Sequence, residues 1–241
     1  AKSIEKKIKK ELEEMLKEDR EKYDNFFKNF GMQLKFGVYN NFGMNKDVLK
    51  DLIMFYSSTE EKLVTLKEYV SRMKDAQDKI YYACGESISK INTLPQVESI
   101  KDKGYEILYL TEYVDEFCLQ VLMEYEGKKF ANICSEDVNV DSEEEKKELE
   151  EKNKNNSEMF KEMLGFLKDD IKEVRYTNKL KNHPVCLSTK GNVSVEMEKV
   201  INAMPTDEKI SSEKILEINE NHPIAEKLEK LYKDDKELLE K

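Results

Sequence analysis

The sequence predicts a mixed fold: a helical segment and a small αβα three-layer unit of the α/β class, then a separate α+β C-terminal domain. Three observations predict it. The 241 residues are 38% charged and include only eight Gly and four Pro, which favours helices with solvated faces over an all-β fold. In segment 103–122 a short apolar run gives way to apolar residues at helical spacing, as in a buried strand followed by a helix. A highly charged stretch after residue 140 separates two such apolar regions.

The N-terminal part is expected to be helical. Residues 1–30 have a long amphipathic pattern, and residues 31–45, with three glycines, are expected to form a loop. Asn45 is a candidate N-cap for a second helix over residues 46–56. Thr65 and Glu68 have the spacing of a capping box, which places a short helix just before the sheet.

The central sheet is predicted from short apolar runs rich in aromatic and branched side chains, at 80–84, 105–109 and 130–133. Helical patterns fill the gaps between them, at 86–91, 96–103 and 114–122. Strands and helices that alternate at these lengths predict a small, mostly parallel sheet with helices packed on it.

A second folding unit is predicted after the charged stretch. Twelve of the eighteen residues 141–158 are charged, which favours a solvated helix or linker over an interaction tail. An apolar helical stripe covers 159–171, a helix is expected at 193–204, and Pro223 suits the first position of a last helix. Strands are expected at 174–177, 185–189 and 215–218. The order α, β, β, α, β, α predicts an α+β domain.

Charge and cysteine usage exclude several classes of protein. The net charge of −10 argues against a general affinity for nucleic acid or anionic membrane, because binding phosphates needs clustered Lys and Arg. No apolar run approaches the roughly 18 residues of a membrane span, and no signal peptide pattern opens the sequence. Four cysteines lie in or beside apolar runs without a C-x-x-C pair, which is typical of buried, reduced thiols in a cytoplasmic protein: Cys84, Cys118, Cys134 and Cys186.

The residues give no sign of catalysis or of metal binding. The sequence has no P-loop, dinucleotide-binding or nucleophile-elbow motif. His183 and His222 each precede a Pro and lack a Cys or carboxylate at metal-ligand spacing. Asp115 and Glu116 at a helix start are expected to complement the helix dipole rather than to act as an acid–base couple. We therefore expect no catalytic, cofactor-binding or metal-ligating residues.

The predicted helix at 193–204 leaves two interpretations open. Its apolar residues fall mainly on one side: Val193, Met197, Val200, Ile201 and Met204. That side is either core or, because thioether side chains are flexible and polarisable, a surface for varied apolar partners.

Several segments, in order, resemble the heat-shock protein 90 family of chaperones. YVSRMK (69–74), IYY (80–82), KGYEILYLTEYVDEFC (103–118) and EGKKF (126–130) resemble the middle domain of that family. PVCLST (184–189), MEKVINA (197–203) and LEINENHPI (216–224) resemble its C-terminal domain. The similarity runs across nearly the whole chain, and the spacing is closest to that of the bacterial members.

The resemblance implies that the chain is a piece of a homodimeric, ATP-driven chaperone. The implied domains are 1–64, a helical segment of the middle domain; 65–135, its small αβα part; 136–158, a charged helical linker; and 159–241, a truncated C-terminal dimerisation domain. Both ends of the chain also fall inside helical patterns without caps, as expected for a piece of a longer protein. The nucleotide-binding domain, with its ATP and Mg, would lie outside, so this piece is expected neither to bind nor to hydrolyse ATP.

The resemblance also implies contacts with unfolded or partly folded client proteins in the cytoplasm, as part of protein folding and the stress response. On the middle-domain side these contacts would fall on Glu116, Phe117 and Gln120. On the C-terminal side they would fall on Val193, Met197, Val200 and Ile201. Two alternatives stay open: a purely structural acidic interaction or dimerisation module, in which these residues are buried, and an enzyme with an unrecognised site.

Overall fold

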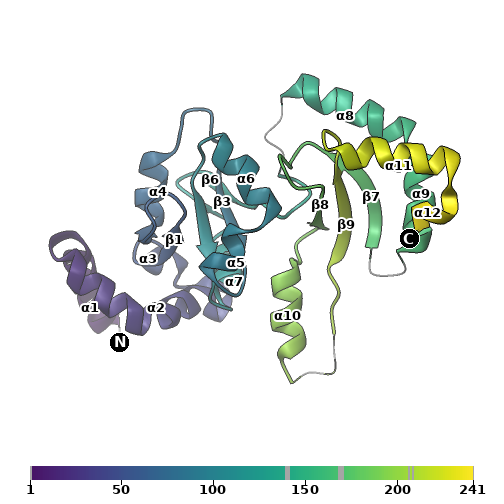
Figure 1. Ribbon diagram of the computed structural model, residues 1–241. Coiled ribbons are helices and arrows are strands. Elements are labelled where there is room, and N and C mark those ends of the chain that lie inside the picture. Colours follow the sequence, from purple (N-terminus) through teal and green to yellow (C-terminus); the bar gives the residue numbers. More distant parts are fainter. Residues whose placement is uncertain (1, 139–141, 168–170, 206, 208, 241) are drawn as a thin grey trace. The chain divides into compact units, whose positions relative to one another are not determined.

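The computed structural model describes residues 2–138, 142–167, 171–205, 207 and 209–240 (Figure 1). It is a mixed α/β chain with two sheets, as the sequence predicts. Contacts group the described residues into two compact units, and each is considered by itself. Unit 1 comprises residues within Ala1–Ile91 and Tyr105–Ala131, and unit 2 comprises residues within Asn92–Gly104 and Asn132–Lys241.

Unit 1 opens with helices and continues as alternating strands and helices. Its helices are α1 (Lys2–Glu18), α2 (Arg20–Gly43), α3 (Lys46–Leu49), α4 (Leu66–Arg72), α5 (Ile88–Asn92) and α7 (Asp115–Leu122). Its strands are β1 (Met54–Ser57), β2 (Leu63–Thr65), β3 (Lys79–Cys84), β4 (Ile107–Leu110), β5 (Glu124–Tyr125) and β6 (Lys128–Asn132). The predicted strands at 80–84, 105–109 and 130–133 are confirmed to within two residues, as β3, β4 and β6.

The strands of unit 1 form a sheet in the order β2-β1-β4-β3-β6-β5. β3 and β4 are parallel, with Tyr82 opposite Leu108, as expected for strands joined through helices. β1 is antiparallel to both β2 and β4, and β5 is antiparallel to β6. The predicted mostly parallel sheet is wrong in this respect, because the hairpins β1–β2 and β5–β6 add antiparallel pairs that the sequence prediction did not contain.

Two further predictions for unit 1 are wrong. Residues 31–45, predicted as a loop, continue helix α2 as far as Gly43. The predicted helix over 46–56 is only one turn, α3, and its last three residues belong to the strand β1. The capping box, in contrast, is confirmed: the Thr65 side chain accepts a hydrogen bond from the Glu68 N–H, and the Glu68 carboxylate accepts one from the Thr65 N–H.

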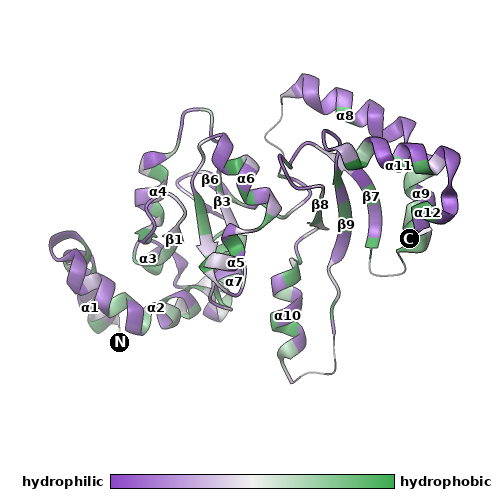
Figure 2. Cartoon of the chain, viewed as in Figure 1, coloured by the Kyte–Doolittle hydropathy of each residue, from purple (hydrophilic) through white to green (hydrophobic). Residues whose placement is uncertain are grey.

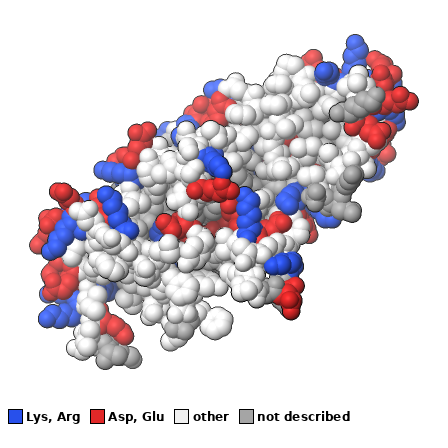
Figure 3. Space-filling model, turned by 60° about the horizontal axis from the view of Figure 1, so that its bottom comes forward, with Lys and Arg blue, Asp and Glu red and all other residues white. Residues whose placement is uncertain are grey.

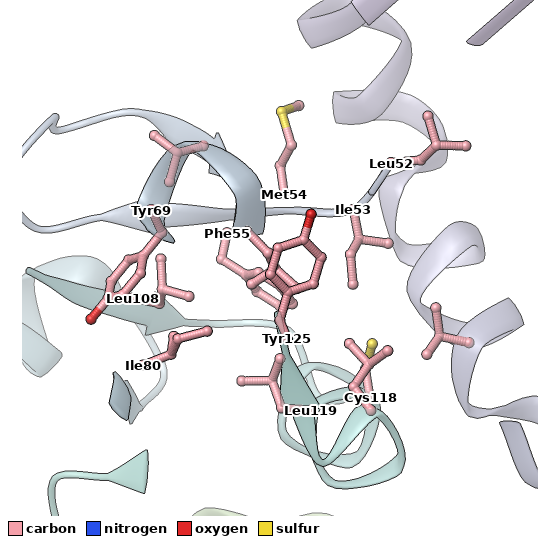
Figure 4. Packing of buried hydrophobic residues seen from close by; sticks show 14 of the residues in the cluster. Leu52, Ile53, Met54, Phe55, Tyr69, Ile80, Leu108, Cys118, Leu119 and Tyr125 are labelled. Carbon is pink, nitrogen blue, oxygen red and sulfur yellow. The ribbon is translucent and has the colours of Figure 1, made fainter. Parts of the chain in front are cut away.

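The core of unit 1 lies where β1 and its neighbouring strands meet α2, α4 and α7 (Figure 4). Residues from these elements and from the segment before β1 are almost fully buried: Tyr23, Val38, Leu52, Ile53, Met54, Phe55, Tyr69, Ile80, Leu108, Cys118 and Leu119. The Tyr23 hydroxyl donates a hydrogen bond to the Leu52 carbonyl and ties α2 to the segment that enters β1. The buried run Leu52–Phe55 is apolar at every position, so it has no period that would distinguish a strand from a helix.

Unit 2 combines helix α6 (Pro95–Asp102) with the C-terminal half of the chain. The further helices are α8 (Glu143–Asn155), α9 (Ser157–Phe166), α10 (Val195–Ala203), α11 (Pro223–Asp234) and α12 (Lys236–Glu240). The strands are β7 (Ile171–Thr177), β8 (Val185–Lys190) and β9 (Glu213–Asn219). The predicted order α, β, β, α, β, α is found in α9, β7, β8, α10, β9 and α11. Ile171, predicted as helical, instead begins β7, and residues 168–170 lie outside the described residues.

The sheet of unit 2 has the order β7-β9-β8, with β9 parallel to β7 and antiparallel to β8. Helix α9 packs on it through Met159 and Phe160, and the Phe160 ring meets the Tyr176 ring edge-on at 4.9 Å. Pro223 begins α11 as predicted, and the His222 Nδ1 accepts a hydrogen bond from the Ile224 N–H at 3.1 Å. In the charged stretch α8 is helical, hydrophilic over nearly its whole length in Figure 2, and without a buried residue; residues 139–141 lie outside the described residues.

Candidate functional site

Helix α7, which carries the first group of predicted site residues, is fixed to α2 by a buried ion pair. The Lys35 ammonium lies 2.7 Å from the Asp115 carboxylate, and both side chains are almost fully buried. The same ammonium lies 4.5 Å from the centre of the Phe55 ring, a cation–π contact. The first turn of α7 is thereby held against α2 and the sheet, which sets the direction in which the next residues point.

The three predicted residues of α7 lie in different environments. The Glu116 carboxylate points inward and accepts a hydrogen bond from the Tyr82 hydroxyl at 3.2 Å, with Glu116 itself buried. Phe117 is half-buried, and its ring meets the Tyr39 ring edge-on at 5.8 Å. Gln120, one turn further along, is exposed. Phe117 and Gln120 can therefore meet a partner at the surface, whereas Glu116 supports the helix from within.

Sequence reasoning missed the residues of α2 that surround Phe117. Phe36 and Tyr39 are in ring contact at 6.1 Å, and both are more than 40% exposed. Phe42 is fully exposed, and Met44 just beyond the helix is 82% exposed. We call Phe36, Tyr39, Phe42, Met44, Phe117 and Val121 the aromatic surface. Phe36, Tyr39 and Phe42 are three residues apart, a spacing that is typical of one helix face. This spacing was not recognised because residues 31–45 were predicted to form a loop.

The second group of predicted residues lies on or next to α10. The Ser194 hydroxyl caps this helix by accepting a hydrogen bond from the Met197 N–H at 3.1 Å. Met197 is only 5% exposed, so its thioether packs within the chain. Val193, Val200 and Ile201 are half-buried. The four residues therefore lie on or next to one helix. Parts of the Val200 and Ile201 side chains are accessible to a partner, whereas the Met197 side chain is not.

Helix α10 is held to the segment before β9 by polar contacts. The Glu198 carboxylate accepts hydrogen bonds from the Ser212 N–H and hydroxyl, and lies 3.4 Å from the Lys214 ammonium. The side-chain amide of Asn202 bonds to both backbone groups of Ile210. The exposed Met204 follows the last turn of the helix.

A charged cluster in unit 2 is centred on a buried carboxylate. Glu217 on β9 is 1% exposed; its carboxylate lies 2.7 Å from Arg175 on β7 and 3.4 Å from Lys179, and it accepts a hydrogen bond from the Ser188 hydroxyl. Burial alone raises the pKa of Glu217, but Lys179, Ser188 and Arg175 together outweigh burial and hold the pKa below its usual range. This cluster joins the three strands of the sheet, and its central carboxylate is fully engaged by side chains of the chain itself.

The thiols and imidazoles of the chain do not assemble into a reactive site. The four cysteines are free, and burial raises the pKa of Cys118 and of Cys186 to about 12, so both stay protonated and poorly nucleophilic. Across the described ranges, no group of three or more His, Cys, Asp and Glu side chains is placed to hold a metal ion. Nor does any described helix have the length and apolar character needed to cross a membrane.

In Figure 3, residues other than Lys, Arg, Asp and Glu cover broad areas, and the charged side chains gather in clusters around them. Within unit 1, the exposed apolar side chains of the aromatic surface are typical of a site that recognises other macromolecules rather than one that performs chemistry on a small molecule. The aromatic surface, set on two helices that are locked together by Lys35 and Asp115, is therefore the best candidate for a functional site in unit 1.

The chain is similar to known proteins over nearly its whole length. The family model described as "Hsp90 protein" matches residues 1–240. "Chaperone protein HtpG" of Bacillus subtilis (strain 168) is 53% identical over 239 residues, which is 99% of this chain and 38% of that protein. "Chaperone protein HtpG" of Clostridium acetobutylicum is 54% identical over 243 residues, and that of Clostridium botulinum (strain 657 / Type Ba4) is 51% identical over 239 residues. These alignments cover 100% and 99% of this chain, and 38% of each relative. The chain thus spans well under half the length of the curated relatives it matches, and it belongs to the Hsp90 protein family.

Proposed function

We propose that this chain is the client-holding and domain-coupling part of an ATP-dependent molecular chaperone that acts in protein folding and the stress response. The names of the relatives, each a "Chaperone protein HtpG", support a chaperone role. The clients are unfolded or partly folded proteins in the cytoplasm, and no nucleic acid or membrane takes part. A client of this kind offers scattered apolar side chains rather than one fixed shape, so it calls for a broad surface with a few apolar anchors.

The observation that carries the proposal is the position of Phe117. Its ring is half-exposed, rests on Tyr39 and lies on a helix that a buried ion pair holds in place. An aromatic ring in this position is rigid and already partly dehydrated, so it gives contact area at little entropic cost. Gln120 beside it supplies an exposed amide that can donate and accept hydrogen bonds with a client backbone.

The second contact surface consists of Val193, Val200 and Ile201 around α10, with Met197 as their buried support. Polar contacts of Glu198 and Asn202 hold the helix in place, so the half-buried side chains present a stable apolar edge. Two separated apolar surfaces on one chain hold an extended client more tightly than either alone, because binding at the second surface becomes intramolecular.

The domain layout is part of the same proposal. Residues 1–64 and 65–135 are assigned to a middle domain whose second part is a three-layer αβα unit, 136–158 to a charged linker, and 159–241 to a C-terminal domain that forms a homodimer in the full-length protein. ATP and Mg are assigned to residues outside this chain. The share of each curated relative that this chain covers, 38%, is compatible with this assignment.

Suppression of aggregation tests the proposal. Light scattering of chemically denatured citrate synthase is expected to fall when the chain is added in excess. Phe117→Ala is expected to reduce this protection at least about twofold, because it removes the central aromatic anchor. Ile4→Ala on α1, which removes another exposed apolar side chain, is the matched control and should protect like the parent chain. Equal protection by the Phe117→Ala and parent chains would refute the proposal.

The alternative is a purely structural acidic module. The burial of Glu116 and Met197 favours it, because both residues lie inside the chain rather than at a free surface. This module would not protect a denatured protein at all, and its apolar edges would serve contacts between subunits. The aggregation assay separates the two functions, because a purely structural module would leave the light scattering of the denatured protein unchanged, whereas both functions allow a dimer to form.

A further inference from the structure

The α2 side of the aromatic surface has no role in the predicted contacts of α7. Phe36 and Tyr39 continue the line of rings that begins at Phe117, with centroid distances of 6.1 and 5.8 Å along it. Tyr39 is 42% exposed and Phe36 47%, so both present a free ring edge or face beyond their mutual contact. The rings of Phe117, Tyr39 and Phe36 therefore form a row with exposed apolar surface, which we call the track.

Phe42 and Gly43, at the end of α2, follow the track in the sequence. Gly43 has a φ of +77°, and a Cβ atom at this position would come within 2.5 Å of the Val121 methyl on α7, so the close approach of the two helices depends on glycine. Phe42 immediately before it has a φ of +54°, a conformation that is unfavourable for a bulky residue. This backbone turns the Phe42 side chain away from the core, and the side chain is fully exposed.

The charges beside the track are mostly negative. From Tyr105 to Gly127 the chain contains six carboxylates, of which Glu106, Asp115 and Glu116 are buried, and no Lys or Arg. The half-buried Lys46, whose side chain lies next to Gly43, is a cation beside the track. Glu112 and Glu124 are exposed just outside the two ends of α7. The nearest cation on α2, Lys35, is buried against Asp115, and Lys50 after α3 pairs with Asp47 at 3.0 Å. An approaching chain therefore meets aromatic rings flanked by exposed carboxylates.

We propose that the aromatic surface binds an extended polypeptide segment in which aromatic or leucine side chains alternate with Lys or Arg, and that Tyr39 and Phe42 are binding residues equal in kind to Phe117. This inference rests on the proposed function and names its substrate class. Apolar side chains lie against the Phe117, Tyr39 and Phe42 rings, and the basic side chains reach the carboxylates at the ends of α7 or stack on a ring as cation–π pairs.

The test measures the binding of fluorescein-labelled peptides by fluorescence anisotropy. One peptide alternates Phe and Arg, a second replaces every Arg by Glu, and a third replaces every Phe by Ser. Tyr39→Ala and Phe42→Ala are each expected to weaken binding of the Phe–Arg peptide about fivefold, the effect of one aromatic contact. Phe30→Ala is the matched control, because Phe30 is 53% exposed on the same helix but nine residues, or about two and a half turns, from Tyr39 and so on the opposite face.

The outcomes separate the two proposals. If Phe117→Ala weakens binding while Tyr39→Ala and Phe42→Ala do not, the extension over α2 is refuted and the proposed function stands. If none of the three changes binding, the proposed function falls as well. Binding of the Phe–Glu peptide as tightly as the Phe–Arg peptide refutes the basic character of the substrate. Binding of the Ser–Arg peptide at parent affinity refutes the role of the rings. Urea unfolding of each variant verifies that the fold is unchanged.

Discussion

Lys35 and Asp115 form the contact on which the position of α7 depends. Both charges are removed from water, and each is compensated mainly by the other at 2.7 Å. A buried pair of this type contributes little net stability compared with apolar side chains, but loss of one partner leaves the other charge buried and uncompensated. The pair therefore acts as a positional lock between α2 and α7.

Asp115→Asn tests this lock. Because the Lys35 ammonium would stay buried without its counter-charge, the free energy of unfolding measured with urea is expected to fall by about 3 kcal/mol. Asp47→Asn is the control, since the ion pair of Asp47 with Lys50 is largely exposed and its loss should leave the urea unfolding midpoint nearly unchanged. Similar effects of the two substitutions would contradict a lock between α2 and α7.

Glu217 gives a prediction about pH. Its pKa in the folded chain lies below the unfolded value of about 4.3, because its interactions with Lys179, Ser188 and Arg175 outweigh the opposing effect of burial. Its contribution to stability is therefore complete above the unfolded pKa and is lost as the pH falls through the folded pKa. Glu217→Gln is expected to lower the unfolding free energy at neutral pH by about 3 kcal/mol and to make it less dependent on pH in the acid range.

Urea unfolding at a series of pH values checks this prediction. Glu173→Gln, which removes a half-exposed partner of Arg175 at 3.4 Å, is the control and should follow the pH profile of the parent chain. A Glu217→Gln profile as steep as that of the parent chain would mean that other carboxylates cause the acid sensitivity.

At the scale of single elements, the ends of helices could be predicted from the sequence better than their interiors. The Thr65–Glu68 box and Pro223 were identified because a cap is a local arrangement of a few residues. The continuation of α2 through Gly31 could not be identified, since glycine there serves a close contact: a Cβ atom would come within 2.5 Å of the Phe27 ring. Close packing and loop formation select the same residue, and the sequence pattern does not distinguish them.

The candidate site could be predicted only in part for a related reason. Phe117 was identified through family resemblance, whereas its ring partner Tyr39 lies far away in the sequence and faces it only because α2 packs on α7. Helical periodicity placed Met197 on an apolar face but could not tell which part of that face is buried. The burial of Met197 follows from the tertiary packing of α10. The polar contacts that hold α10 in place join Glu198 to Ser212 and Asn202 to Ile210, and these partners lie too far along the sequence to be found from helical periodicity.

Thr65→Ala tests the energetic value of the cap on α4. The substitution removes the side-chain oxygen that accepts a hydrogen bond from the Glu68 N–H at 3.2 Å, so the unfolding free energy is expected to fall by about 1 kcal/mol. Ser142→Ala removes the corresponding cap of α8. Because α8 buries no residue, this control should speed amide hydrogen exchange in α8 with little change in the urea midpoint. A global loss from Ser142→Ala as large as that from Thr65→Ala would contradict this assignment.

At the scale of the whole molecule, the chain combines two small cores with an acidic surface. Each core is closed by its own sheet and helices, and the charged helix α8 adds mainly solvated surface, with Leu149 packed against the core of unit 2. The net charge of −10 keeps such a chain soluble while it exposes apolar side chains. It also makes the surface repel polyanions, which bears directly on whether nucleotides bind.

MgATP is therefore not expected to bind this chain. A ligand with a Kd of about 10 μM, present at about 1 mM, would stabilise the folded state by about 2.7 kcal/mol and raise the melting temperature by several degrees. We expect a melting temperature with MgATP that equals the value with Mg²⁺ alone, because the sequence has no P-loop and its excess charge repels triphosphate. A rise of several degrees with MgATP but not with Mg²⁺ would place a nucleotide site within these residues and would overturn our proposal that ATP binds outside this chain.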